Sequence, residues 1–168
     1  LECYIGPEQN LLSVTEKHTK RLFIENPIIT FQDIDAIKNM DHYGFQTEAI
    51  DLTFDVSSSS KDNLEQALDR ICQEVEWAIE NGSGFVVLSD RASDQNRAAV
   101  SSLLACGAVH HHLLNIAKRT QVGIIVETGE AREVHHHCLL LGYGADAIYP
   151  YLAYEAILTA KDEGHLKH

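Results

Sequence analysis

The stretch from Val122 to His137 constrains the fold of this chain most strongly, because an apolar run passes through a Thr-Gly turn into a charged, histidine-rich segment. The run 122–126 is short and β-branched, a pattern typical of an inner strand of a parallel sheet. The segment 130–141 is predicted to be a helix that begins near Glu130, where the helix dipole favours negative charge. Gly142 is predicted to end it as a C′ glycine. The stretch therefore predicts one β-α step.

The same alternation repeats from residue 49 onward. Strands are predicted at 50–54, 85–88, 122–126 and 145–149, and helices at about 62–79, 101–119, 130–141 and from 151. Repeated β-α steps with short loops require parallel strands joined by right-handed crossovers. We therefore predict an α/β fold whose β-α units form a mainly parallel sheet, resembling a partial (β/α) barrel. An open, doubly wound sheet fits the same pattern.

The chain is predicted to fold as one compact domain with two parts. Residues 1–48 form an irregular N-terminal segment with two short helices, one at about 15–23 and one that follows a capping box formed by Thr30 and the acid three positions later. Residues 49–168 form the β-α repeat core. Because the chain opens on leucine and not methionine, we expect it to be a fragment of a larger chain.

The charge and the cysteines exclude several classes of protein. With 25 acidic and 13 basic side chains the net charge is −12, which disfavours binding to nucleic acid. No apolar run is long enough to cross a membrane, and no signal peptide is visible. Four widely spaced cysteines are typical of a reducing compartment. We expect a cytoplasmic or stromal protein that is not secreted.

Ten histidines, six of them in two triplets, raise the question of a metal site. Consecutive helical residues point in different directions, so a triplet cannot converge on one ion. Two better-spaced pairs could assemble a Cys₂His₂ zinc site if their helices face each other. These pairs are Cys106 with His110 and His135 with Cys138. We predict no metal in this chain and keep this site as the alternative.

Two polar segments follow predicted strands, and in α/β proteins such segments lie at the carboxyl edge where sites are found. They are the loop 90–97 and the turn 127–132. Their paired acids and arginines could do acid–base work or bind an anionic substrate, but no nucleophile elbow or phosphate-binding glycine loop accompanies them. We interpret them as an ion-paired surface that docks another domain. The residues concerned are Asp90, Arg91, Arg97, Glu127, Thr128, Glu130, Arg132 and His136.

Longer motifs carry a family resemblance over about residues 1–155. They are LECYIGPEQNLL at the start, VLSDR, SSLLACGAVHHHL, GIIVETGEAREVHHH and LGYGADAIYPYLAYE. Together they resemble the central domain of the large chain of glutamate synthase. The pattern departs at Tyr149, where the family has asparagine before Pro150-Tyr151.

The resemblance implies a function for a parent enzyme and not for this chain alone, so we predict no catalytic and no cofactor-binding residue in this chain. That enzyme hydrolyses glutamine, passes ammonia through a tunnel to 2-oxoglutarate and reduces the product with FMN, which receives electrons through an iron–sulfur cluster. The resemblance implies that the central domain joins the amidotransferase and FMN-binding domains of the same chain and flanks the tunnel. The parent's electron donor would be a partner subunit or ferredoxin. The alternative is a free-standing α/β enzyme or a metal-binding domain.

Overall fold

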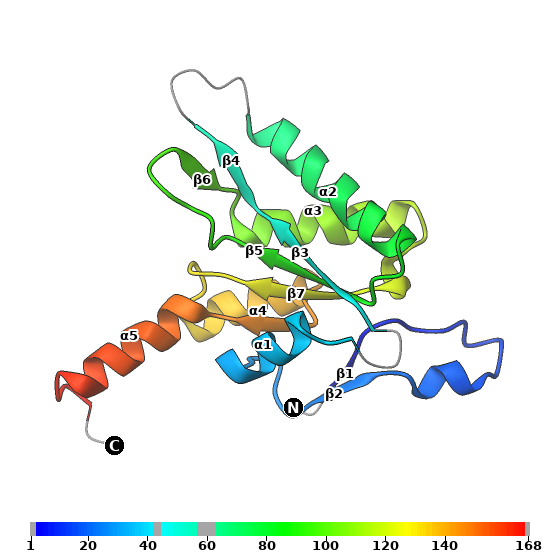
Figure 1. Ribbon diagram of the computed structural model, residues 1–168, viewed down its shortest axis with the longest axis horizontal. Helices are drawn as coiled ribbons and strands as arrows, with labels where there is room; N and C mark the ends of the chain where they lie inside the picture. Colours follow the sequence, from blue (N-terminus) through cyan, green and yellow to red (C-terminus); the bar gives the residue numbers. More distant parts are fainter. Residues whose placement is uncertain (1–2, 42–44, 57–62, 167–168) are drawn as a thin grey trace.

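The computed structural model describes residues 3–41, 45–56 and 63–166. Within these residues, four parallel strands form the central sheet in the order β3-β5-β7-β8 (Figure 1). The strands are β3 (Thr47–Asp51), β5 (Phe85–Ser89), β7 (Gly123–Glu127) and β8 (Ala147–Tyr149). The helices that follow them are α2 (Leu64–Glu80), α3 (Ser102–Asn115), α4 (Val134–Gly142) and α5 (Tyr151–Asp162). The predicted α/β fold with repeated β-α units and a parallel sheet is confirmed.

The register of the sheet explains why its strands are apolar on both faces. Ile50, Leu88, Val126 and Ile148 form one row across the sheet and pack with α2, α3 and α4. The neighbouring row lies one position earlier in each strand and includes Ala49, Val87 and Ile125. Its side chains point to the other face of the sheet. There the row joins a second core cluster with α1 (Phe31–Lys38) and with the strands β1 (Cys3–Ile5) and β2 (Leu22–Ile24). Burial on both faces accounts for the continuous apolar runs.

The N-terminal segment covers the second face of the sheet. Strand β1 (Cys3–Ile5) pairs antiparallel with β2 (Leu22–Ile24), and a 3₁₀ helix, η1 (Glu16–Thr19), lies between them. The helix predicted at 15–23 is therefore wrong beyond Thr19, because residues 22–24 are extended and Ile24 enters the second core. The second predicted helix is α1, and its capping box between Thr30 and Asp33 is present.

Several other predicted boundaries differ from the structure. The helix predicted at 101–119 is α3, which ends at Asn115. The strand predicted at 50–54 divides into β3 and β4 (Thr53–Asp55), because β4 leaves the sheet and pairs antiparallel with β6 (Arg97–Ala99) (Figure 1). Helix α4 starts at Val134, four residues later than predicted, since residues 128–133 form the connection from β7. It ends through Gly144, whose φ of 110° requires glycine, and Gly142 remains helical.

Helix α5 projects from the body of the molecule (Figure 1). Residues 151–154 and Ala160 are partly covered, and residues 155–159 are exposed. The ribbon with η1 projects on the other side in the same view. Among the described helices, none combines the length and the apolar character needed to cross a membrane.

Candidate functional site

The last row of the parallel sheet places four side chains at its carboxyl edge. The register aligns Asp51, Ser89, Glu127 and Tyr149 across β3, β5, β7 and β8. Side chains two positions apart in a strand share a face, so this row faces the same side as Val87 and Ile125, toward α1. The edge predicted from the sequence therefore exists, and its polar row points at a helix from the N-terminal segment.

Glu127 is the centre of the first group of contacts. It is 3% exposed, and its Oε2 accepts hydrogen bonds from Lys38 Nζ at 2.7 Å and Ser89 Oγ at 2.6 Å. Its Oε1 pairs with Arg91 Nε at 3.2 Å. A buried carboxylate needs such donors to offset its desolvation. The side chain thus ties β7 to α1 and to the segment after β5.

Asp90 is the centre of the second group. It is 4% exposed and accepts hydrogen bonds from Thr128 Oγ1 at 2.7 Å, from the Gly129 backbone N–H at 2.9 Å and from Tyr151 Oη at 2.9 Å. Burial, together with the hydrogen bond to Asp90, raises the pKa of Tyr151 to about 12. Tyr151 therefore stays a neutral donor at physiological pH, and Asp90 joins the connections after β5, β7 and β8.

Arg91 lies over these two groups and remains partly open to solvent. Its guanidinium carbon is 4.2 Å from the centre of the Tyr151 ring, and it also pairs with Glu155 at 3.9 Å. Its side chain is 44% exposed. We name the set of Lys38, Ser89, Asp90, Arg91, Glu127, Thr128 and Tyr151 the carboxyl-edge cluster.

Glu130 is predicted to lie at the start of the helix 130–141, but its side chain caps α3 instead. Its Oε2 accepts from the Ser102 backbone N–H at 2.7 Å and from the Ser102 hydroxyl at 2.8 Å. It therefore caps the amino end of α3 from a different element, where a carboxylate also interacts favourably with the helix dipole. A small cavity of about 210 Å³ lies beside it and is also lined by His136 and Leu140.

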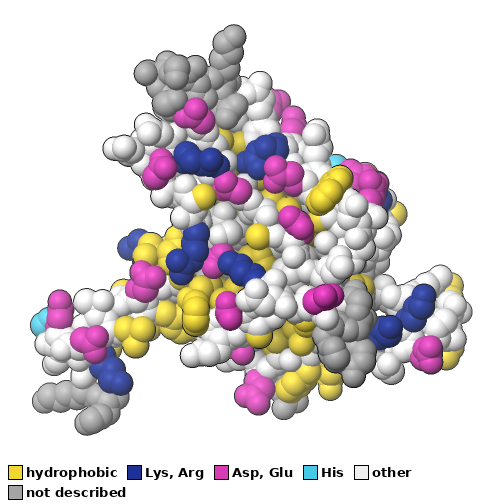
Figure 2. Space-filling view, in the orientation of Figure 1, with side chains coloured by type: hydrophobic (Ala, Val, Ile, Leu, Met, Phe, Trp, Pro, Cys, Tyr) yellow, Lys and Arg dark blue, Asp and Glu magenta, His cyan; other side chains and the backbone are white. Residues whose placement is uncertain are grey.

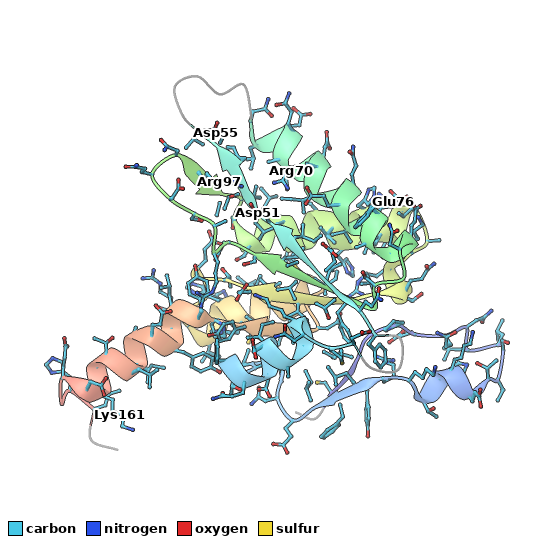
Figure 3. All side chains as sticks on the ribbon, viewed as in Figure 1. Asp51, Asp55, Arg70, Glu76, Arg97 and Lys161 are labelled. Atoms are coloured by element: carbon cyan, nitrogen blue, oxygen red, sulfur yellow. The ribbon has the colours of Figure 1, made fainter. Side chains whose placement is uncertain are left out.

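Arg97 and Arg132 lie outside the carboxyl-edge cluster. Arg97 donates a hydrogen bond to Thr53 Oγ1 at 2.8 Å and forms an ion pair with Asp51, at the bend where β4 leaves the sheet. Arg70 donates hydrogen bonds to the backbone carbonyls of Asp51 and Thr53 at the same bend (Figure 3). Arg132 is exposed, and its Nε donates to the Gly129 carbonyl at 3.3 Å. Of the eight predicted residues, the structure brings four together, and these are Asp90, Arg91, Glu127 and Thr128.

Sequence reasoning missed three members of the carboxyl-edge cluster. Ser89 and Tyr151 carried a local signal, because each stands beside a predicted strand end. Lys38 carried none, since it lies on a helix of the N-terminal segment, 89 positions from Glu127. Both buried carboxylates accept hydrogen bonds from their own chain, so the cluster fastens the loops. Arg91 of the cluster is exposed, and so are Arg97 and Arg132 outside it.

The four residues of the alternative zinc site have different surroundings. Cys106 is fully buried, its Sγ is 3.7 Å from the Tyr143 carbonyl oxygen, and burial raises its thiol pKa to about 12. His110 accepts a hydrogen bond from Arg119 Nε at 3.0 Å, and burial lowers its pKa. His135 and Cys138 are exposed on α4. In the described part of the chain, no group of three or more His, Cys, Asp or Glu side chains is arranged to hold a metal.

Comparison with known proteins gives consistent matches over the whole chain. The family model described as glutamate synthase central domain matches residues 1–168. The NADH glutamate synthases of Saccharomyces cerevisiae and Schizosaccharomyces pombe are 40% and 44% identical over 100% and 99% of this chain. The large chain of the NADPH glutamate synthase of Bacillus subtilis is 38% identical over 97%. The chain spans 8% of the length of the two yeast proteins and 10% of the bacterial one.

Proposed function

The chain belongs to the glutamate synthase central domain family, and from this premise we propose that it is a linking module without catalytic residues of its own. In this proposal it joins the amidotransferase and FMN-binding domains of one polypeptide and flanks the ammonia tunnel between them. The parent enzyme makes glutamate from glutamine-derived ammonia and 2-oxoglutarate. FMN and an iron–sulfur cluster belong to its other domains.

The comparison supports a role that does not depend on the electron donor. Relatives named for NADH and for NADPH match nearly the whole chain at similar identity, 44% and 38%. A domain that bound the donor would be expected to differ more between them, since the two nucleotides differ by a phosphate that a binding site must accommodate. We therefore place binding of the electron donor in another domain or in a partner.

The proposal rests on one observation, which is that groups of the chain itself already bind both buried carboxylates. Asp90 and Glu127 lie where an α/β enzyme would hold an acid or a base, yet three groups of the chain itself bind each of them. A general acid or base must reach the proton that it transfers. Carboxylates fixed in this way shape the loops, and the accessible cations Arg91, Arg97 and Arg132 remain for docking.

Removing one docking cation is expected to loosen the coupling between the parent's two reactions. In the full-length enzyme, Arg132→Ala should raise the ratio of glutamine hydrolysed to 2-oxoglutarate consumed. The excess of this ratio over the fully coupled value should roughly double, because an exposed ion pair worth about 0.5 kcal/mol shifts a docking equilibrium by about that factor. Parallel assays of glutamine loss and 2-oxoglutarate loss measure the ratio.

Lys17→Ala is the matched control, since Lys17 is an exposed cation on η1, away from the carboxyl edge. Its ratio should equal that of the unmodified enzyme. An unchanged ratio in Arg132→Ala and in the corresponding Arg91 and Arg97 variants would contradict the docking role.

The purified chain is expected to bind no cofactor. Absorbance spectra and elemental analysis after purification should show no stoichiometric flavin, iron or zinc. Stoichiometric zinc that disappears in a Cys138→Ser variant would instead establish the alternative metal-binding domain. Stoichiometric flavin would mean that the strand-end loops form a cofactor site and would overturn the linking role.

A further inference from the structure

An apolar groove of about 450 Å³ runs between α4 and α5. Apolar side chains from three segments line it, and they include Pro27, Ile28, Leu141, Pro150, Tyr154 and Ile157. Val134 and Cys138 of α4 lie along the same groove and are exposed. We call it the α4–α5 groove. It shares no lining residue with the carboxyl-edge cluster, and Arg132 is one of the residues that line it.

The outer wall of the groove is a helix with little support from the rest of the domain. None of the residues of α5, all of which the structure describes, is buried. Ile157 and Leu158 are 54% and 58% exposed, and Val134 on the opposite wall is 80% exposed. Figure 2 shows hydrophobic side chains along this projecting helix and on the adjoining body. An isolated helix of this length is marginal in water, so its stability depends on packing against another element.

We propose that the α4–α5 groove binds an apolar helix from another domain of the same polypeptide. Two helices that enclose an apolar trough are the usual receptor for a third helix, which inserts side chains spaced three and four residues apart. This inference rests on the proposed linking function, because it needs further domains on the same chain. It names which surface they use, and that surface is distinct from the docking arginines except at Arg132.

Two observations favour an occupant from the same polypeptide over a second copy of this chain. The relatives are about ten times longer than the matched region, since it covers 8–10% of them, and a tethered helix binds at high effective concentration. The net charge of −12 makes two copies repel one another. A helix in the groove would bury Ile157 of α5, which is exposed within this domain, together with Val134 of α4.

Alkylation of Cys138 in the native full-length polypeptide tests whether the groove is covered. Cys138 is exposed in this domain, so in an open groove it would react as a free thiol does. We expect it to react at least roughly tenfold more slowly than the same thiol in the urea-unfolded polypeptide, after correction with a model thiol, because a packed helix blocks access. Cys106 should stay unreactive under native conditions whatever the state of the groove, since it is buried and its pKa is about 12.

A substitution in the groove should reverse the protection. Ile157→Asp introduces a charge into the contact and is expected to raise the alkylation rate of Cys138 by roughly tenfold. Leu114→Asp is the matched control, because Leu114 is 50% exposed on α3 and lies outside the groove. It should leave the rate unchanged. If the Ile157 variant fails to fold, the protection measured in the unmodified polypeptide still decides the question.

A photo-crosslinking amino acid at Ile157 identifies the occupant. A crosslink to a helix of the same polypeptide outside residues 1–168 supports the proposal. A crosslinked dimer would assign the groove to a second copy and overturn it. Rapid alkylation of Cys138 without a crosslink would show an open groove and would also overturn it. None of these results depends on the reaction stoichiometry of Arg132→Ala, so the groove and the coupling role can fail separately.

Discussion

Replacing Asp90 with alanine is expected to lower the free energy of unfolding by about 3 kcal/mol or more, because it leaves several buried donors without an acceptor. Thr128 Oγ1, the Gly129 N–H and Tyr151 Oη all donate to this one carboxylate, and Thr128 is fully buried. Each unsatisfied buried donor costs about 1–3 kcal/mol. The measurement is urea denaturation of the purified chain, followed by circular dichroism.

Two further variants separate loss of the acceptor from loss of shape. Asp90→Asn keeps the size of the side chain and one acceptor oxygen, so we expect an intermediate loss of about 1–2 kcal/mol. Asp69→Ala removes an exposed carboxylate on α2 and should change the stability by less than about 0.5 kcal/mol. A loss in Asp90→Ala no larger than that in Asp69→Ala would show that the loops do not depend on this carboxylate.

Replacing Glu127 with alanine is expected to cost about 1.5–3 kcal/mol, because the partly buried Ser89 hydroxyl loses a charged acceptor while the two partly exposed cations can be rehydrated. Lys38 and Arg91 both converge on this carboxylate, at 2.7 and 3.2 Å, and without it two cations face each other. Since Lys38 is the last residue of α1, amide hydrogen exchange in that helix should also rise. Denaturation curves and exchange mass spectrometry measure the two effects.

The matched control is Glu155→Ala, which removes the other carboxylate near Arg91. Glu155 is 59% exposed and 3.9 Å from the guanidinium, so the expected loss is below about 0.5 kcal/mol. A Lys38→Met variant combined with Glu127→Leu should recover part of the loss, because it removes the buried carboxylate together with one of its two cations. Equal losses for Glu127→Ala and Glu155→Ala would refute the assignment of Glu127 as the centre of the cluster.

The position of the site was predictable, whereas its contacts were not. The loops after β5 and β7 were expected at one edge because parallel strands end on the same side. Sequence spacing does not show that Asp90 and Glu127 are buried, since isolated acids in polar loops are usually exposed. The expected role of Glu130 at its own helix illustrates the same limit. Its carboxylate caps α3 instead, and only the packing of α3 beside the turn makes that contact available.

The sequence by itself determined the β-α alternation, the parallel sheet and, through its long motifs, the family. The spacing of apolar residues in a helix shows which side is buried, and the strands of a parallel sheet that is buried on both faces are continuous apolar runs. Only the tertiary structure decided that β4 leaves the sheet for β6 and that Lys38 meets Glu127. It also decided that Phe85 fills the space left by Gly6 and Gly123, where an added Cβ would lie 2.8 Å from the ring. These contacts join residues far apart in the chain, and their partners are selected by shape and charge once the layers have packed, so local patterns cannot contain them.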